Sequence, residues 1–211
     1  MSYNCEYLDG DINGEGRTYD VNGNIIFIGE FLNGIKNGKA KEFAKNGEKL
    51  LFDGEFKNDH IWSGKQKGYN NDNWTYFDGV YINRRKWCGK FSQYFYGGQQ
   101  IEYKCEYYCG YKNGFYEEYY ESGQLRFKAE YLNGVLNGKI LAYHKNGKLD
   151  YEGEYVNGKL KGKGKEYFDN GKLKFEGEYL NDEKWNGKIF DKNGVFSGEI
   201  VNGKQNLIEK K

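Results

Sequence analysis

The residues best suited to metal or nucleophile chemistry are few and scattered. Cysteines stand at positions 5, 88, 105 and 109, and the two histidines are His60 and His144. Cys105 and Cys109 are close in sequence, but no second close pair accompanies them and neither histidine is near. Because a structural zinc ion needs four clustered ligands, we expect no metal site and no cofactor. In the absence of a signal sequence, the cysteines are expected to be free thiols in a reducing compartment.

The acidic residues are distributed by a repeat and do not converge on one point. Seven of them hold the same slot in successive copies: Glu30, Glu55, Glu106, Glu130, Glu154, Glu178 and Glu199. Catalysis requires an acid, a base or a nucleophile that point at one reacting group. Solvated pairing with lysine on a neighbouring strand explains a periodic row of acids. We therefore expect no catalytic residues, and the chain is predicted not to be an enzyme.

The repeat has a period of about 24 residues, within the range typical of stacked-repeat proteins. Its clearest copy is GEYVNGKLKGKGKEYFDNGKLKFE, residues 153–176. The copies begin near positions 5, 29, 54, 79, 105, 129, 153, 177 and 198. The array is therefore predicted over residues 1–203, followed by a polar C-terminal tail at 204–211. Such arrays build long binding surfaces in which each copy contacts only its neighbours.

Composition limits the class of protein. Hydrophobic residues make up 37% of the chain and its mean hydropathy is −0.97, yet aromatic residues reach 18%, too many for a disordered chain. With 32 basic and 31 acidic residues, no strong field attracts nucleic acid, so a nucleic-acid partner is not expected. The first residues lack a signal-peptide pattern, and no apolar run is long enough to span a membrane. A cytoplasmic location is predicted.

Each copy is predicted to be a β-hairpin. An Asn-Gly or similar pair separates two alternating segments, which is the strongest short signal for a hairpin. With Asn170-Gly171 as a two-residue turn, aromatic residues and glycines fall on one face, whereas Lys165 and Lys163 pair with glutamates on the other. The predicted pairs are Phe168–Leu173, Tyr167–Lys174, Glu166–Phe175, Lys165–Glu176, Gly164–Gly177, Lys163–Glu178 and Gly162–Tyr179. The predicted fold is all-β, an elongated, single-layer, twisted antiparallel meander of about eight hairpins.

The pattern GEYxNGKxxGKGKEYxxNGKLxxE resembles the MORN repeat, especially the longer variant found in YwqK-like antitoxin proteins. The resemblance covers nearly the whole chain but fails at residues 68–78, and Gly97-Gly98 replaces Asn-Gly in one copy. It implies a half-pipe of β-hairpins that serves as a scaffold or docking surface. It also implies that some relatives associate with membranes and some dimerise through the ends of the array.

Tryptophan and the central aromatic residues are the candidates for partner binding. Trp62, Trp87 and Trp185 each precede a Gly-Lys pair by two residues, where regular copies carry Leu136 or Leu160. They are interpreted either as plugs that pack over a loop or as exposed anchors of an interface. The candidate partner-binding residues are Trp62, Trp74, Arg84, Arg85, Trp87, Tyr94, Tyr96, Tyr107, Tyr131, Tyr155 and Tyr179.

Three functional hypotheses follow from these features. The first is a non-enzymatic scaffold or adaptor that binds a protein partner along its aromatic-lined face. The second is an antitoxin or immunity protein that neutralises a toxin by direct binding. The third is a peripheral lipid-binding module, for which the basic cluster at residues 84–86 is too small to anchor alone. Homodimerisation through the ends of the array is a further alternative.

Overall fold

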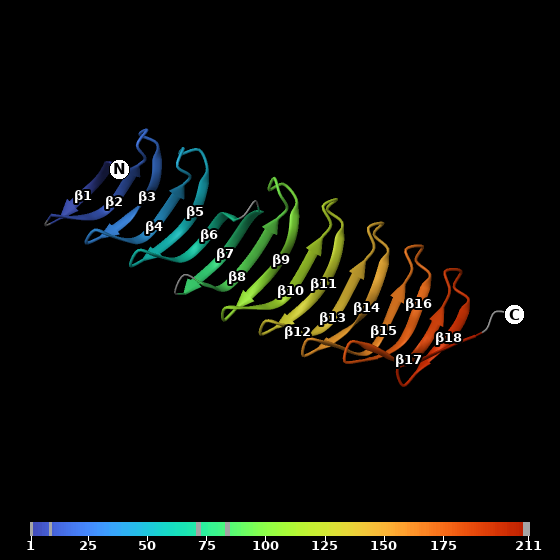
Figure 1. The fold of residues 1–211 in the computed structure, drawn as a ribbon. Coiled ribbons are helices and arrows are strands. Elements are labelled where there is room, and N and C mark those ends of the chain that lie inside the picture. Colours follow the sequence, from blue (N-terminus) through green and yellow to red (C-terminus); the bar gives the residue numbers. More distant parts are fainter. Residues whose placement is uncertain (1, 9, 71–72, 83–84, 209–211) are drawn as a thin grey trace. The chain divides into compact units, whose positions relative to one another are not determined.

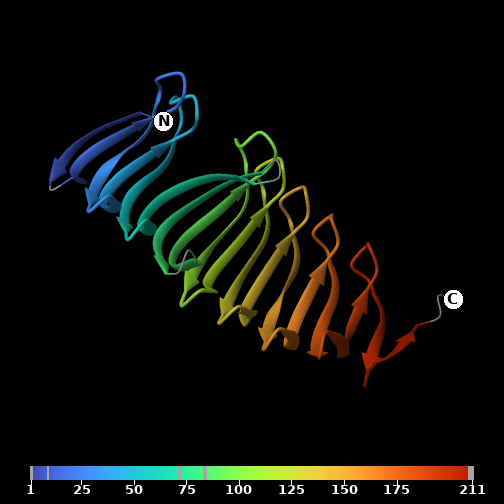
Figure 2. The same ribbon diagram turned by 60° about the vertical axis from the view of Figure 1, so that its left-hand side comes forward.

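The computed structural model describes residues 2–208 except 9, 71–72 and 83–84, and within these residues every regular element is a β-strand. The chain divides into an N-terminal unit, residues 1–99 with 107–110, and a C-terminal unit, residues 100–106 with 111–211. In each unit, strands that follow one another in sequence pair antiparallel, which makes a meander (Figures 1 and 2). The predicted all-β meander is confirmed.

The N-terminal unit contains eight strands among its described residues: β1 (Ser2–Leu8), β2 (Asp11–Tyr19), β3 (Ile25–Leu32), β4 (Ile35–Phe43), β5 (Leu50–Lys57), β6 (His60–Asn70), β7 (Asn73–Ile82) and β8 (Arg85–Tyr94). Strand β9 (Ile101–Tyr108) contributes residues to both units. The strands of the C-terminal unit that follow are β10 (Tyr111–Tyr119), β11 (Leu125–Leu132), β12 (Val135–Leu136), β13 (Gly138–Tyr143), β14 (Leu149–Val156), β15 (Lys159–Tyr167), β16 (Leu173–Leu180), β17 (Glu183–Phe190), β18 (Phe196–Val201) and β19 (Lys204–Leu207). The expected polar tail thus begins with a strand, which pairs with β18.

Two kinds of turn connect the strands, one at each end of the hairpins. At the first kind, Asn133 and Gly134 both have positive φ angles, 51° and 83°, and form a two-residue turn between the paired residues Leu132 and Val135. We call this end the tight-turn end. Each tight turn is tied to the next: the Gly158 N–H, for example, donates to the Leu136 carbonyl oxygen at 2.8 Å. Successive tight turns are therefore held in line.

The other end carries a three-residue loop, and here the predicted turn was wrong. In residues 169–171 only Gly171 has a positive φ, 85°, and its N–H donates to the Phe168 carbonyl oxygen at 2.8 Å. This is a type I turn followed by a left-handed glycine. Tyr167 consequently pairs with Leu173, which replaces the predicted Tyr167–Lys174 and Phe168–Leu173 pairs. We call this end the loop end.

A β-bulge then restores the predicted register. The ladder shifts by one residue between Glu166 and Tyr167, after which Glu166–Phe175, Lys165–Glu176, Gly164–Gly177, Lys163–Glu178 and Gly162–Tyr179 pair as predicted. The bulge adds one residue to β16 and cancels the extra residue of the loop. The same count in the neighbouring copies, from Asn146-Gly147 and Ser122-Gly123, predicts the Gly138–Tyr155 and Gly114–Tyr131 pairs, and the structure contains both. The division of side chains between the two faces therefore follows the prediction.

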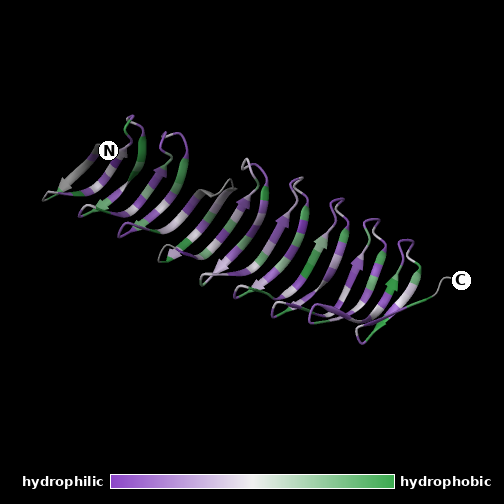
Figure 3. Ribbon diagram, viewed as in Figure 1, coloured by the Kyte–Doolittle hydropathy of each residue, from purple (hydrophilic) through white to green (hydrophobic). Residues whose placement is uncertain are grey.

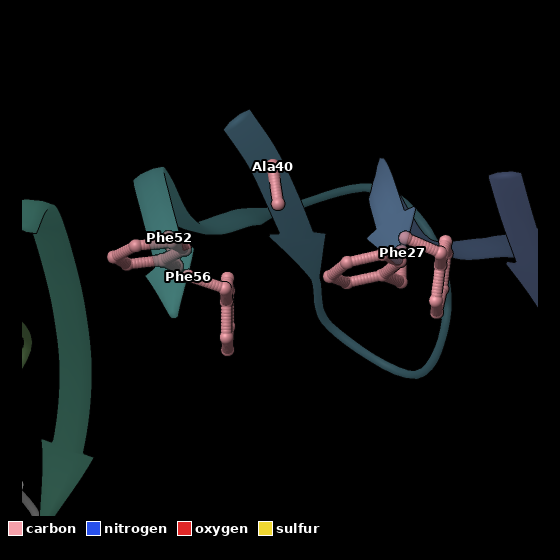
Figure 4. Close-up of a cluster of buried hydrophobic side chains, with 5 residues drawn as sticks. Phe27, Ala40, Phe52 and Phe56 are labelled. Carbon is pink, nitrogen blue, oxygen red and sulfur yellow. The ribbon is translucent and has the colours of Figure 1, made fainter. Parts of the chain in front are cut away.

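One face of each unit, the aromatic face, forms its core. In the N-terminal unit, phenylalanines of β3 and β5 pack edge to face: the ring centroids of Phe52 and Phe56, both on β5, lie 5.1 Å apart, and that of Phe27 on β3 lies 5.9 Å from that of Phe56 (Figure 4). In the C-terminal unit, Phe175 and Tyr179 are 1% and 5% exposed, and Ile200 completes the cluster. No second layer of secondary structure covers these rings among the described residues. A lysine side chain covers them instead. Lys184 Nζ lies 4.8 Å from the Phe175 ring centroid and 2.8 Å from Glu166 Oε1.

Glycines let the aromatic rings lie close to the backbone. A Cβ atom at Gly177 would stand 2.7 Å from the Phe175 ring and 2.5 Å from the Gly187 Cα of the paired strand. Gly138 faces Tyr155, so the pattern of aromatic residues opposite glycines predicts that the Tyr155 ring covers it, but the structure differs. Its φ is 113°, and a Cβ there would meet the Glu130 carboxylate. Gly138 thus serves the backbone conformation, whereas Gly177 serves close packing.

Candidate interaction surfaces

The three aligned tryptophans occupy β-bulges near the tight-turn end. In β17, Lys184 pairs with Tyr179 and Asn186 with Glu178, so Trp185 between them is an inserted residue. Trp62 and Trp87 interrupt the ladders of β6 and β8 in the same way. The predicted equivalence with leucine was therefore wrong: Leu160 pairs with Tyr155, as Lys184 does with Tyr179. The alignment of tryptophan with leucine was based on their distance from the following Gly-Lys pair, and this distance does not reveal that the tryptophan is an inserted residue.

Two of these indoles pack against the next tight turn. A Cβ at Gly110 would lie 3.7 Å from the Trp87 ring, and one at Gly203 would lie 3.6 Å from the Trp185 ring. The carbonyl oxygens of Trp87 and Trp185 also accept the N–H groups of these glycines. Trp62 is exposed, and the Lys57 ammonium lies 4.8 Å from its ring. The contacts agree with plugs over a turn, although Trp62 and Trp87 keep substantial exposed surface.

Trp74 does not join the other candidate tryptophans. It pairs with Tyr69 near the far end of the β6–β7 hairpin, whereas Ser63, next to Trp62, pairs with Val80. Six residues of strand separate these pairs, about 20 Å. The Lys49 ammonium lies 3.2 Å from the Trp74 ring, and Gly98 packs directly against it. The candidate residues Trp62, Trp74 and Trp87, which we call the central segment, therefore do not form one patch.

The remaining central candidates are dispersed. Arg84 lies outside the described residues, and Arg85 is exposed at the start of β8, where it pairs with Ile82. Tyr94 is partly buried at the end of β8, and Tyr96 in the following loop is 79% exposed. Tyr107 packs on the aromatic face, with its ring centroid 6.2 Å from that of Phe91.

The three tyrosines of the regular copies belong to the aromatic face. Burial raises the pKa of Tyr131, Tyr155 and Tyr179 above the ordinary value. The Tyr179 hydroxyl also donates to Glu166 Oε1 at 2.7 Å. Although burial raises the pKa of Glu166, hydrogen bonds from Lys184 and Tyr179 leave it below the ordinary value. These tyrosines are held by the chain's own core, and Tyr179 is too buried to contact a partner without rearrangement.

The opposite face, the charged face, is hollowed. In the C-terminal unit a groove of about 660 Å³ runs across β13–β16, lined by Lys139, Glu154, Lys163, Glu178 and neighbouring residues. A groove of about 700 Å³ lies on the same face of the N-terminal unit. Lysine and glutamate alternate across the strands, as in the Lys139–Glu154 and Lys163–Glu178 pairs. The groove walls are therefore close to neutral overall.

One carboxylate on the charged face is held more firmly than the rest. Glu117 lies 2.8 Å from Lys104 Nζ and 3.3 Å from Lys128 Nζ, and it accepts the Tyr119 hydroxyl at 2.7 Å. The hydrogen bond from Lys104 is the main reason that the pKa of Glu117 falls to about 2. The charges form a fixed local network at this point.

A row of exposed apolar residues lies on the charged face next to the tight turns, a strip that we call the rim of the charged groove, and sequence analysis missed it. Leu132, Val156, Leu180 and Val201 each precede a tight turn and are 51%, 38%, 38% and 42% exposed. We call these four residues the apolar column. Their preceding neighbours point to the aromatic face, so the column faces the groove. Hydrophobic and hydrophilic segments alternate accordingly along the strands (Figure 3). The signal was visible as an apolar residue before the Asn-Gly or Asn-Asp pair of each of these four tight turns.

Residues with metal or nucleophile chemistry remain apart. Cys88 is exposed, Cys105 is buried, and Cys109 begins a tight turn with φ 50°. His144 Nε2 lies 3.0 Å from the Tyr167 carbonyl oxygen at the loop end, and His60 Nδ1 lies 2.6 Å from the Asn58 carbonyl oxygen. Over the residues that the structure describes, no three His, Cys, Asp or Glu side chains are grouped to hold a metal ion. In the same residues, no helix has the length and hydropathy needed to cross a membrane.

Comparison with known families matches the repeat itself. Residues 27–49 and 151–172 match the MORN repeat, and residues 112–133 and 136–157 match a MORN repeat variant. The matches support a MORN-repeat protein. Each matched segment spans parts of two consecutive strands and the turn between them, which is the structural unit of the array. No curated protein matches the chain.

MORN repeats are generally scaffold or membrane-binding modules. The matched MORN segments include two of the four residues of the apolar column, Leu132 and Val156. Trp62, Trp74 and Trp87 lie between the matched segments, at residues 50–111. The finer resemblance to YwqK-like antitoxins stays a prediction.

Proposed function

We propose that this chain is a non-enzymatic repeat scaffold or adaptor that binds a protein partner through the charged face of its C-terminal unit. The observation that carries the proposal is the apolar column on the groove rim. Four exposed aliphatic side chains at the same position of consecutive copies expose apolar surface that a partner can cover. The aromatic face, favoured from sequence, is filled by the chain's own packed rings. The binding surface is therefore assigned to the opposite face.

Capture from the native cell followed by reconstitution tests this function. A protein that co-purifies with the full chain is expressed alone, and hydrogen exchange is measured on the chain with and without it. We expect slower exchange in β14–β18 around the groove and no chemical change in the partner. Slower exchange only around Trp62 and Trp87 would move the surface to the N-terminal unit. A chain that binds no protein in its native lysate would refute the scaffold function.

The antitoxin or immunity role is a finer form of the same proposal. It requires that the captured partner be toxic by itself and that the purified chain suppress this toxicity at a stoichiometric ratio.

Homodimerisation through the ends of the array is a separate prediction. Light scattering of the purified full chain gives the mass directly, and a monomer over the whole concentration range would exclude it.

A second candidate, a peripheral lipid-binding module, is favoured by one observation. Exposed Trp62 and Trp87 lie near the tight-turn end of neighbouring hairpins, where Lys57 and Arg85 also lie. Tryptophan beside basic residues suits the interface of an anionic membrane. Flotation with phosphatidylserine vesicles, compared with phosphatidylcholine vesicles, tests this role. Binding that disappears in a Trp62→Ala, Trp87→Ala double variant would support it, and absence of flotation would end it.

A further inference from the structure

The apolar column alternates with hydrogen-bond donors along the rim of the charged groove. Lys161 pairs with Leu180 on the neighbouring strand, and Asn137 and Asn186 hold the corresponding positions beside Val156 and Val201. The rim therefore presents one aliphatic side chain and one polar side chain per repeat.

The two asparagines have their amide groups oriented by the tight turns. The Asn137 side-chain oxygen accepts the Asn157 N–H at 3.1 Å, and the Asn186 oxygen accepts the Asn202 N–H at 2.9 Å. Because the oxygen is fixed by the turn, the NH₂ group, which carries two donors, is directed away from it. The rim thus supplies donors at fixed positions, and Lys161 supplies a third.

The spacing of the column selects the conformation of a partner chain. Consecutive column residues are two strands apart, about 9.6 Å. A polyproline II helix advances about 9.3 Å in one turn of three residues, so every third side chain meets the column with a mismatch of about 0.3 Å per repeat. Seven residues of an α-helix advance about 10.5 Å, which accumulates a mismatch of about 3 Å over three repeats. In an extended strand, successive side chains point to opposite faces. Side chains three residues apart therefore lie on opposite faces and cannot both contact the column.

The backbone of such a partner also fits the donors. A polyproline II chain has no internal hydrogen bonds, so its carbonyl oxygens need external donors. Asn137, Lys161 and Asn186 recur once per repeat, which gives one donor for each turn of the bound chain. Exposed aromatic rings extend the rim at its beginning: Phe115 pairs with Glu130 and so shares the face of Leu132, and the Tyr111 ring lies against Gly134 of the next tight turn. Aromatic surfaces are the usual contact for proline rings.

We infer that the rim of the charged groove in the C-terminal unit docks a proline-rich segment of another protein in the polyproline II conformation. The inference rests on the proposed scaffold function and names its partner class. The chain itself contains no proline, so a second copy does not supply this segment. Lys139, Glu154, Lys163 and Glu178 line the adjoining groove with balanced charge, which suits a segment with little net charge. Each turn places one apolar residue on the column and one carbonyl oxygen on a donor.

The test uses the full chain and a synthetic 12-residue peptide with proline at every third position. Its controls are a peptide of the same composition in scrambled order and an amphipathic helical peptide with a seven-residue repeat. We expect the periodic peptide to bind, with at least tenfold weaker affinity for Leu180→Asp and, independently, for Val156→Asp. Val195→Asp is the matched control, because Val195 is exposed in a loop outside the column. Thermal melts establish that each variant is folded.

The outcomes separate this inference from the function on which it rests. Binding of the periodic peptide that is lost in both column variants and retained in Val195→Asp supports the inference. Equal binding of periodic and scrambled peptides, or preference for the helical peptide, overturns it. If Leu180→Asp loses a captured native partner that has no proline-rich segment, the scaffold function stands and this inference falls. If Leu180→Asp changes only the oligomeric mass, the column is a contact between copies and the inference also falls.

Discussion

The two faces of the C-terminal unit are built from alternating residues of the same strands, but one face forms the core and the other is exposed. Phe175 and Tyr179 are almost fully buried on one face, whereas Glu176 and Glu178, each one residue away, are exposed on the other. Buried aromatic area stabilises the fold, and exposed charge contributes little. The comparison teaches that the face richest in rings is not the face that is free to bind. Recognition is left to a few aliphatic residues at the rim of the charged face.

Phe175→Ala should produce the largest difference between the faces. The ring is 1% exposed and packs against Tyr179 at 5.5 Å. Its loss leaves a cavity in a single-layer core, and we expect unfolding free energy to fall by about 3–5 kcal/mol. Glu178→Ala on the other face should change it by no more than about 0.5 kcal/mol. Chemical denaturation of both variants measures the difference, and equal effects would mean that the faces are exchanged.

Tyr155→Ala and Glu154→Ala repeat the comparison at a less buried pair. Tyr155 is only partly buried, so its loss should cost about 2 kcal/mol, less than that of Phe175. Glu154 is exposed, and its loss should cost well under 1 kcal/mol. The midpoints of chemical denaturation, compared at equal dependence of the unfolding free energy on denaturant concentration, give the two losses of stability. A larger effect at Glu154 would show that the charged face carries structural interactions here that its exposure does not indicate.

These two comparisons could be designed from sequence because the period of two survives the irregularities of the chain. The Gly162–Tyr179 pair was predicted correctly although the turn was not, since the bulge in β16 cancels the extra loop residue. The turn type could not be predicted, because Asn-Gly forms a two-residue turn at 133–134 and part of a three-residue loop at 170–171. Identical dipeptides adopt different backbones once tertiary contacts differ.

The candidate site was less predictable than the fold. Aromatic residues were chosen because they dominate interfaces, yet they also fill the core here, and composition cannot separate the two uses. Trp74 shows the same limit, since its packing against Gly98 involves residues far apart in sequence. Leu180 and its equivalents Leu132, Val156 and Val201 are visible in the sequence, but only the alternation of faces along the strand before a tight turn shows that they are exposed.

Trp87→Ala and Trp185→Ala sharpen the contrast between packing and recognition. Both indoles lie over the glycine of the next tight turn, Gly110 or Gly203, so each loss should lower the unfolding free energy by about 1–2 kcal/mol. Neither residue belongs to the apolar column, and affinity for the periodic proline peptide should stay unchanged in both. Melting temperature and peptide affinity are measured on each variant. Loss of partner affinity in Trp87→Ala alone would restore the central segment as the binding site.

The smallest expected effect is electrostatic and concerns the network around Glu117 on the charged face. The pKa of Glu117 is lowered to about 2, chiefly by the hydrogen bond from Lys104, so its ionised form is favoured by folding. A carboxylate with a lowered pKa stabilises the fold above its unfolded pKa of 4.5, and this contribution is lost as pH falls from about 4.5 towards 2. Glu117→Gln should therefore lower stability at pH 7 by no more than about 1 kcal/mol, since the pair is partly solvated. The difference from the native chain should shrink as pH falls through this window. A difference that stays constant down to pH 2 would mean that the network contributes by packing and not by charge.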